Sequence, residues 1–130
     1  MSEAVDIESV MAAHATEAVE HAKERFGFDL DYSPESISQV EEALAEVAND
    51  IEWLCRMYGG YVGEVLRRQH GGEWSLDDDL PDAERVIGLT LSNGTRLFPP
   101  SKVAKRLHQG EGDSIKFYYK VVSQEARKGA

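Results

Sequence analysis

The chain has 130 residues, and its 24 acidic and 14 basic side chains give a formal net charge of −10. This length fits a single domain over residues 1–130, and a composition of 42% hydrophobic and 29% charged residues is typical of a soluble globular protein. A charge of this sign argues against general binding to nucleic acid or to anionic lipid, because both need cationic side chains.

Three features of the sequence predict a cytoplasmic protein with no membrane association. The apolar runs are shorter than the roughly 20 residues that a membrane span requires. The first ten residues, MSEAVDIESV, carry acidic side chains and lack the basic and apolar segments of a signal peptide. The single cysteine, Cys55, has no partner for an internal disulfide, which is typical of a reducing compartment.

The charge is unevenly distributed along the chain. Residues 1–58 hold 14 acidic and three basic side chains, a net charge of −11, whereas residues 59–130 have a net charge of +1. Residues 95–130 alone carry +5. The exclusion of nucleic acid is therefore weaker for this basic segment, although we do not expect nucleic acid to be the partner.

Hydrophobic residues recur at intervals of three and four through the first half of the chain, which is the pattern of amphipathic helices. A first helix is predicted over residues 4–26, followed by the stop signal Gly27. Ser33-Pro34-Glu35 is typical of a second helix start, with Ser33 as the N-cap. From there the pattern continues unbroken to Val65.

This long pattern fits either one helix from Pro34 to His70 or two shorter helices. We favour two helices, over residues 34–48 and 50–70, because Asn49 and Asp50 prefer helix caps to helix interiors. The Gly71-Gly72 pair ends the last of them.

Three short strands and two more helices are predicted after Gly72. The strands cover residues 73–77, 86–91 and 95–98, and Asn93-Gly94 predicts a two-residue type I′ hairpin between the last two. A short helix follows over residues 101–109. Residues 114–127 alternate partly as a strand would, but a polar cap and helix-favouring residues indicate a helix.

The predicted fold class is α+β, with three N-terminal helices, a three-stranded antiparallel meander and two C-terminal helices. The helices are expected to pack on one face of the sheet. Because such a small sheet has open edges, pairing of two copies into a homodimer is a further hypothesis.

The most distinctive segment has three glycines, Gly59, Gly60 and Gly63, inside the third predicted helix. Each glycine costs about 1 kcal/mol relative to alanine in a helix, so some interaction must offset them. We favour close packing against the first helix, whose small residues are Ala15, Ala18 and Ala22. The alternative is a groove that admits a ligand, and its candidate binding residues are Tyr61, Glu64, Arg67 and Trp74.

Other chemically interesting residues have simpler interpretations. His14, Glu17 and His21 have a spacing that can hold a metal on one helix, but nothing completes the site, so we predict no metal and no other cofactor. Cys55 is interpreted as a buried small hydrophobe and Trp53 as a core residue. No catalytic motif is present, so no catalytic residue is predicted and an enzyme is not favoured.

Two segments resemble a group of small uncharacterised bacterial proteins. These are Gly-Gly-Tyr-Val-Gly-Glu-Val-Leu-Arg-Arg at 59–68 followed by Gly-Gly-Glu-Trp at 71–74, and the Pro100–Leu107 segment. The resemblance covers about residues 59–122. It implies a bacterial source, the order helix, meander, helix, and a helix over 114–127. No activity or catalytic residue comes with it.

The leading functional hypothesis is a non-enzymatic acidic interaction module, such as an immunity-like protein or an adaptor, that docks a basic protein. Its acidic surface would combine the first two helices with the loop residues Asp77, Asp78, Asp79, Asp82 and Glu84. The alternative is a small ligand-binding protein or enzyme that uses the groove around Gly59–Gly63 with Glu64 and Arg67. A third is a homo-oligomer whose acidic face is merely solvated.

Overall fold

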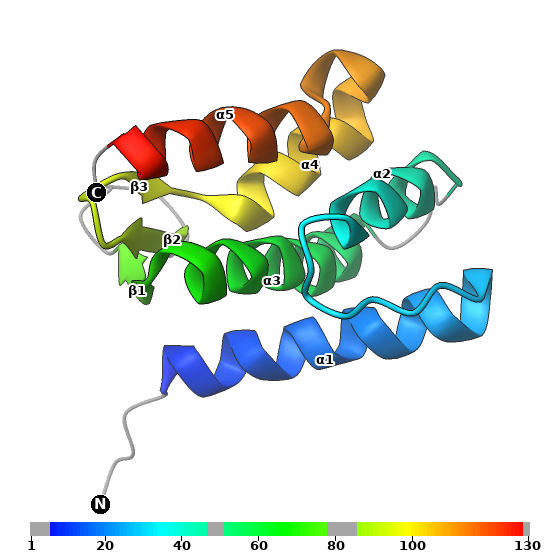
Figure 1. Cartoon of the computed structure of the whole chain (residues 1–130). Helices are drawn as coiled ribbons and strands as arrows, with labels where there is room; N and C mark the ends of the chain where they lie inside the picture. Colours follow the sequence, from blue (N-terminus) through cyan, green and yellow to red (C-terminus); the bar gives the residue numbers. More distant parts are fainter. Residues whose placement is uncertain (1–5, 47–50, 78–85, 129–130) are drawn as a thin grey trace, which may run out of the picture.

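The computed structural model describes residues 6–46, 51–77 and 86–128, and these form the predicted α+β arrangement (Figure 1). In chain order the elements are α1 (Ile7–Phe26), α2 (Ser36–Glu46), α3 (Ile51–His70), β1 (Gly72–Asp77), β2 (Val86–Leu91), β3 (Arg96–Leu97), α4 (Pro99–Gln109), a 3-10 turn (Gly110–Asp113) and α5 (Ile115–Lys128). No helix within the described ranges is long and apolar enough to cross a membrane.

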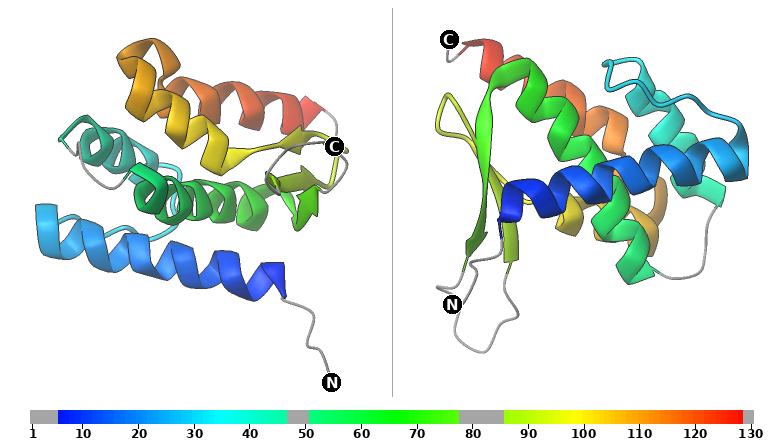
Figure 2. Two further views of the ribbon diagram at one scale, coloured as in Figure 1. Left: turned by 180° about the vertical axis from the view of Figure 1, so that it is seen from behind. Right: turned by 90° about the horizontal axis from the view of Figure 1, so that it is seen from below.

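Helix α3 is the centre of the molecule. It lies between α1 on one side and the pair α4 and α5 on the other (Figures 1 and 2). Every residue from Met57 to Leu66 is buried, so this helix has no solvated face over that stretch, as expected for a helix surrounded by others. Tyr58 and Tyr61 are the largest of its fully buried side chains.

The helix boundaries follow local signals in the sequence. Gly27 adopts a left-handed conformation at φ 74°, and its N–H bonds the carbonyl of Lys23, which ends α1 as predicted. Ser33 Oγ accepts the N–H of Ser36 at 3.2 Å, as expected of an N-cap. The choice of two helices over one is confirmed, and the proposed Asn49-Asp50 cap lies outside the described residues.

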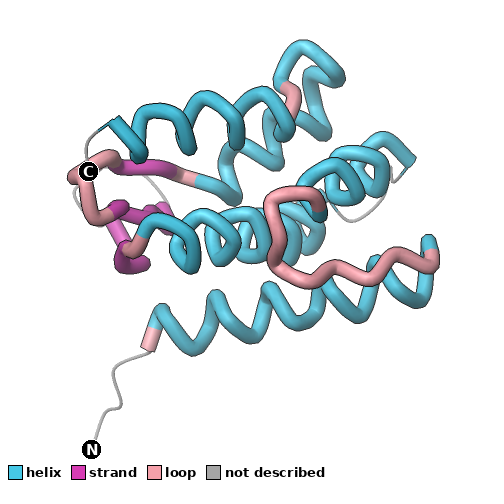
Figure 3. Tube along the Cα trace, viewed as in Figure 1, coloured by secondary structure: helices cyan, strands magenta, loops and turns pink. Residues whose placement is uncertain are grey.

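The connection between α1 and α2 turns back along α1 before entering α2 (Figure 3). Leu30 of this connection is buried, and Tyr32 takes a left-handed backbone conformation at φ 65°. That conformation is uncommon for a residue with a side chain. The backbone N–H of Tyr32 donates to the hydroxyl of Tyr61 at 2.7 Å, which holds the connection against α3.

The three strands form an antiparallel meander in the order β1-β2-β3. Trp74, Leu89 and Leu97 share one row of the register and are buried. This face of the sheet is therefore covered, and helices α1, α3 and α4 contact the strands. The edge strands are β1 and β3, and pairing of two copies through an edge stays a prediction.

The hairpin between β2 and β3 is present, but its turn is not the predicted type I′. Leu91 O accepts from Gly94 N, and Leu91 N donates to Thr95 O, both at 2.8 Å, which makes a three-residue loop. Gly94 has a positive φ of 91°, whereas Asn93 does not. Asn93 instead accepts the N–H of Thr95 on its side-chain oxygen at 3.0 Å. This is the three-residue hairpin with a glycine bulge.

Two more predictions are settled by the described helices. Residues 115–128 are helical, which confirms helix over strand for the last element. Cys55 is buried, as predicted, but Trp53 is 46% exposed, so its assignment to the core is wrong. Trp53 lies one residue before Leu54, the first buried residue of α3, and its ring is nearly perpendicular to that of His14, with 6.0 Å between the two centroids.

Candidate functional site

Two of the α3 glycines lie directly against neighbouring elements, with no room for a side chain. A Cβ atom built on Gly59 would lie 2.5 Å from Pro100 Cα, at the start of α4. One built on Gly63 would lie 2.1 Å from Cη2 of Trp74, in β1. These contacts support the packing interpretation of the glycines, with α4 and β1 as partners in place of the α1 partner that we expected.

Helix α1 does contact α3, but at the remaining glycine. A Cβ atom on Gly60 would lie 3.1 Å from His14 Cβ and 3.2 Å from Met11 O. The small residues of α1 are completely buried in the same core, as predicted: Ala15, Ala18 and Ala22. The space beside all three glycines is therefore occupied by side chains and backbone of the chain itself.

Glu64 is the polar centre of this packed region. Its side chain is 2% exposed, and Arg67 donates to both oxygens, from Nε at 2.7 Å and from Nη2 at 3.0 Å. Trp74 Nε1 donates to Oε2 at 2.8 Å, and Arg68 Nε lies 3.7 Å from Oε1. Three of the four predicted binding residues, Glu64, Arg67 and Trp74, are thus brought together.

The electrostatics of Glu64 suit a permanent ion pair more than proton transfer. Burial by itself would raise the pKa of Glu64, but the hydrogen bonds from Arg67 and Trp74 outweigh it and hold the pKa below its usual value. A general acid or base needs a pKa near the working pH. A carboxylate held ionised by two donors serves instead to join α3 to β1.

The fourth predicted binding residue, Tyr61, interacts with the connection between α1 and α2 and not with the Glu64 cluster. Its hydroxyl bonds Ser36 Oγ and the backbone of Tyr32, both at 2.7 Å, and the guanidinium of Arg68 lies 3.6 Å from the centre of the Tyr32 ring. Burial raises the pKa of Tyr61, so its hydroxyl stays protonated. Tyr61 therefore fastens the connection after α1 and does not join Glu64 around a cavity.

The predicted acidic docking loop falls largely outside the described residues. Residues 78–85, which include Asp78, Asp79, Asp82 and Glu84, are not described. Asp77 is the last residue of β1, and its Cα pairs with that of Val86. The role of this loop stays a prediction.

Of the two histidines of α1, His21 has a hydrogen-bond partner for its Nδ1 and His14 does not. His21 Nδ1 lies 2.7 Å from the hydroxyl of Tyr58, and burial lowers the pKa of this imidazole. His14 Nδ1 is buried and lies 3.3 Å from Glu17 Oε1 without hydrogen-bond geometry. Across the described ranges, no group of three or more potential ligands is arranged to hold a metal.

Glu41 of α2 forms a cluster that the sequence did not reveal. Its carboxylate accepts from Arg106 Nε, from Ser114 Oγ at 2.8 Å and from the backbone N–H of Lys116 at 3.1 Å. It therefore ties α2 to α4 and also caps the positive end of α5. Glu41 follows the buried Val40 in an ordinary amphipathic pattern, so the sequence did not distinguish it from other surface carboxylates of α2.

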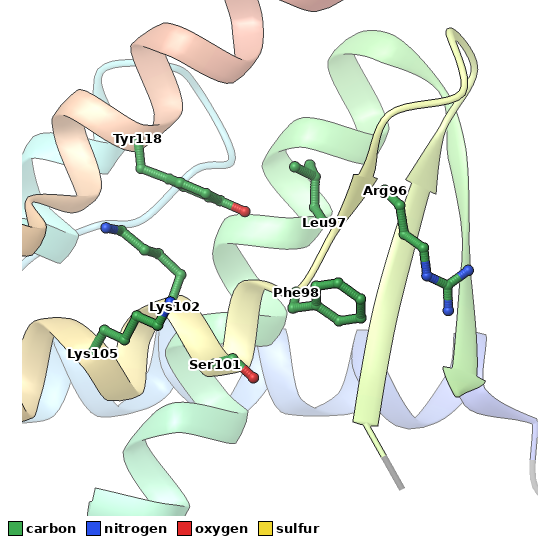
Figure 4. A pocket seen from close by; sticks show the side chains of 7 residues that line it. All are labelled: Arg96, Leu97, Phe98, Ser101, Lys102, Lys105 and Tyr118. Atoms are coloured by element: carbon green, nitrogen blue, oxygen red, sulfur yellow. The ribbon is translucent and has the colours of Figure 1, made fainter. Parts of the chain in front are cut away.

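A hollow of about 420 Å³ opens at the start of α4, outside all the predicted site residues. Its volume lies within the range of small-molecule sites, about 300–1,000 Å³. Three side chains are cationic and the apolar wall comes from β3 and α5 (Figure 4); the lining residues are Arg96, Leu97, Phe98, Ser101, Lys102, Lys105 and Tyr118. The excess of basic residues over residues 95–130 was the one feature of the sequence that indicated a cationic site here. It did not indicate which of these basic side chains would lie close together.

No protein-family model, curated protein or solved structure matches the chain. The resemblance to small uncharacterised bacterial proteins over residues 59–122 therefore stays a prediction.

Proposed function

We propose that this protein is a non-enzymatic interaction protein whose acidic helical surface docks a basic protein partner, as an immunity-like protein or an adaptor would. The observation that carries this proposal is a set of exposed like-charged pairs on the N-terminal helices. Glu20 and Glu24 are exposed one turn apart on α1, and Glu42 and Glu46 are exposed one turn apart on α2.

These pairs weaken the isolated helices. Like charges four residues apart destabilise a helix by about 0.2–0.5 kcal/mol per pair, and none of the four carboxylates forms an ion pair with another described residue. Complementary charge on a partner would turn this repulsion into attraction and raise the rate of association. Exposed, unpaired carboxylates of this kind support a docking role for the acidic surface.

The basic C-terminal segment leaves most of this acidic surface uncompensated. Between described residues, the pair formed by Glu41 and Arg106 is the one ion pair that joins residues 1–58 to residues 95–128. Two other basic residues of that segment pair locally, Lys102 with Asp113 and Lys128 with Glu125. The exposed carboxylates of Glu20, Glu24, Glu42 and Glu46 thus remain available to a partner.

The competing hypothesis, an enzyme or ligand-binding protein built on the glycine segment, has less support. The positions beside Gly59, Gly60 and Gly63 are filled, and the Glu64 carboxylate is saturated by internal donors. A substrate would have to displace Trp74 before it reached that carboxylate.

The proposal is tested by affinity capture from a lysate of the source cells at low and at high salt. The acidic-face variant is Glu20→Lys/Glu24→Lys, and the matched control Glu73→Lys/Glu125→Lys makes the same charge change elsewhere. We expect the wild type and the control to capture a basic protein at low salt. High salt should abolish this capture, and so should the acidic-face variant.

The proposal is overturned if no basic protein is captured, or if the acidic-face variant captures the same protein as well as the wild type does. Circular dichroism of each variant establishes that a loss of capture does not come from unfolding.

A further inference from the structure

Two polar groups in the hollow at the start of α4 have no hydrogen-bond or ion-pair partner among the described residues. These are Lys105 Nζ and the Tyr118 hydroxyl, which line the hollow. Lys102 Nζ is shared, since it lies 3.2 Å from Asp113 Oδ1 and 5.5 Å from the centre of the Tyr118 ring. A ligand that enters this hollow therefore meets an ammonium group and a hydroxyl ready to donate.

The charged side chains that line the hollow are all basic, whereas the chain as a whole is acidic. The described lining residues include Arg96, Lys102 and Lys105 and no carboxylate, although the protein carries a net charge of −10. Figure 4 shows the Arg96 guanidinium turned away from Tyr118 and the two lysines, and its Nη2 lies 3.5 Å from Ser75 Oγ of β1, so the charge nearest the Tyr118 ring comes from the lysines. Local cationic charge within a low-dielectric wall attracts and orients an anion.

Apart from Ser101, the remaining lining residues are apolar or aromatic. Figure 4 shows the Tyr118 ring reaching across from α5 above the two lysines of α4, with Phe98 on the side nearer the sheet. Leu97 closes the wall between them. Burial raises the pKa of Tyr118 to about 12, so at neutral pH the hydroxyl remains a neutral donor. Two rings and a leucine offer contact to a flat apolar body.

We propose that this hollow binds a small organic anion, a flat apolar body that carries a phosphate, sulfonate or carboxylate group. The anionic group meets Lys105, Lys102 and the Tyr118 hydroxyl, and the apolar body lies between the rings of Phe98 and Tyr118. This site is separate from the acidic helical surface, and its occupant is a small molecule instead of a protein.

The experiment titrates the full chain with 1-naphthyl phosphate by isothermal calorimetry. Two comparison probes separate the parts of the proposed ligand, since 1-naphthol has the ring without the charge and inorganic phosphate has the charge without the ring. We expect saturable binding of 1-naphthyl phosphate, about tenfold or more tighter than that of either comparison probe. Amide chemical shifts should change around residues 97–105 and at Tyr118.

Three variants locate the binding. Lys105→Glu should weaken 1-naphthyl phosphate binding about tenfold or more, because it removes a charge-assisted hydrogen bond and adds repulsion. Tyr118→Phe keeps the ring and loses the hydroxyl, so we expect a loss of about threefold. The control Lys120→Glu reverses an exposed lysine on α5 that does not line the hollow, and it should bind like the wild type.

Absence of saturable binding overturns the proposal. Inorganic phosphate bound as tightly as 1-naphthyl phosphate also overturns it, because the apolar wall would then contribute nothing. So does an equal loss in Lys105→Glu and Lys120→Glu, because that result indicates nonspecific attraction to positive charge. None of these outcomes depends on the partner of the acidic helices.

Discussion

The variant Gly63→Ala distinguishes packing from helix propensity, because the two effects have opposite signs. Alanine is favoured over glycine inside a helix by about 1 kcal/mol, so propensity alone predicts a more stable protein. In the structure the added methyl group would lie 2.1 Å from Cη2 of Trp74, which is 4% exposed. Trp74 must therefore move, and its hydrogen bond to the Glu64 carboxylate is lost.

The expected magnitude follows from these contacts. Overpacking costs about 1–3 kcal/mol, and loss of a hydrogen bond to a charged group costs about 1.5–3 kcal/mol. After the propensity gain of about 1 kcal/mol is subtracted, the free energy of unfolding should fall by about 1.5–5 kcal/mol. Urea denaturation followed by circular dichroism measures this change without depending on tryptophan fluorescence.

Two further variants control the Gly63→Ala measurement. Gly112 has nothing within 4 Å of an added Cβ, so Gly112→Ala should leave stability nearly unchanged. In a Trp74→Phe background the clash is relieved, and Gly63→Ala should then cost at least about 1 kcal/mol less than in the wild type. A wild-type-like or more stable Gly63→Ala protein would refute the assigned contact between α3 and β1.

Three other substitutions or probes test the polar and buried groups. The variant Glu64→Gln should differ most from the wild type in its free energy of unfolding at neutral pH, and the difference should shrink as the pH falls below 4.5. The reason is that the folded-state pKa of Glu64 is lowered, so the stability that its carboxylate contributes is lost when the carboxylate is protonated. Urea denaturation at a series of pH values measures this difference. Glu41→Gln should lower the free energy of unfolding by about 1–3 kcal/mol through its weakened bonds to Arg106 and to the start of α5, again measured in urea. The Cys55 thiol, whose pKa is raised first by burial and then by the charge of Glu52, should react with a disulfide reagent slowly in the native protein and fast in urea; a fast native reaction would contradict its burial.

The parts of the fold that sequence predicts well are those decided by neighbouring residues. Gly27 ends α1 because the left-handed conformation is open to glycine, and Ser33 caps α2 because its hydroxyl reaches the next free N–H. The hydrophobic period identified α3, whereas a polar cap and helix-favouring residues indicated α5, over which the period itself was ambiguous. The turn at Asn93-Gly94 shows the limit of such rules, since two hairpin types share these residues and the Asn93 side chain bonds Thr95 in the one that forms.

The candidate sites depend on contacts that no local pattern encodes. The glycine segment indicated a close approach, but nothing in its spacing identified Pro100 or Trp74 as the atoms that approach. Glu41 and Arg106 look like ordinary helix-surface residues until α2 and α4 meet. The prediction that Trp53 lies in the core was wrong because the hydrophobicity of a side chain indicates only how much free energy its burial would contribute. It does not indicate whether another element covers that side of the helix.

The net charge of the chain conceals two surfaces with opposite preferences. Exposed carboxylates on α1 and α2 attract cations, while the hollow beside Lys102 and Lys105 attracts anions, and the Glu41–Arg106 pair joins the two halves. Among the described residues, no ion pair joins Glu20 or Glu24 to Lys102 or Lys105, so we expect the two surfaces to act independently. The Glu20→Lys/Glu24→Lys variant should therefore bind 1-naphthyl phosphate normally, and Lys105→Glu should capture the basic partner normally. A loss in either crossed measurement would mean that one charged surface serves both ligands.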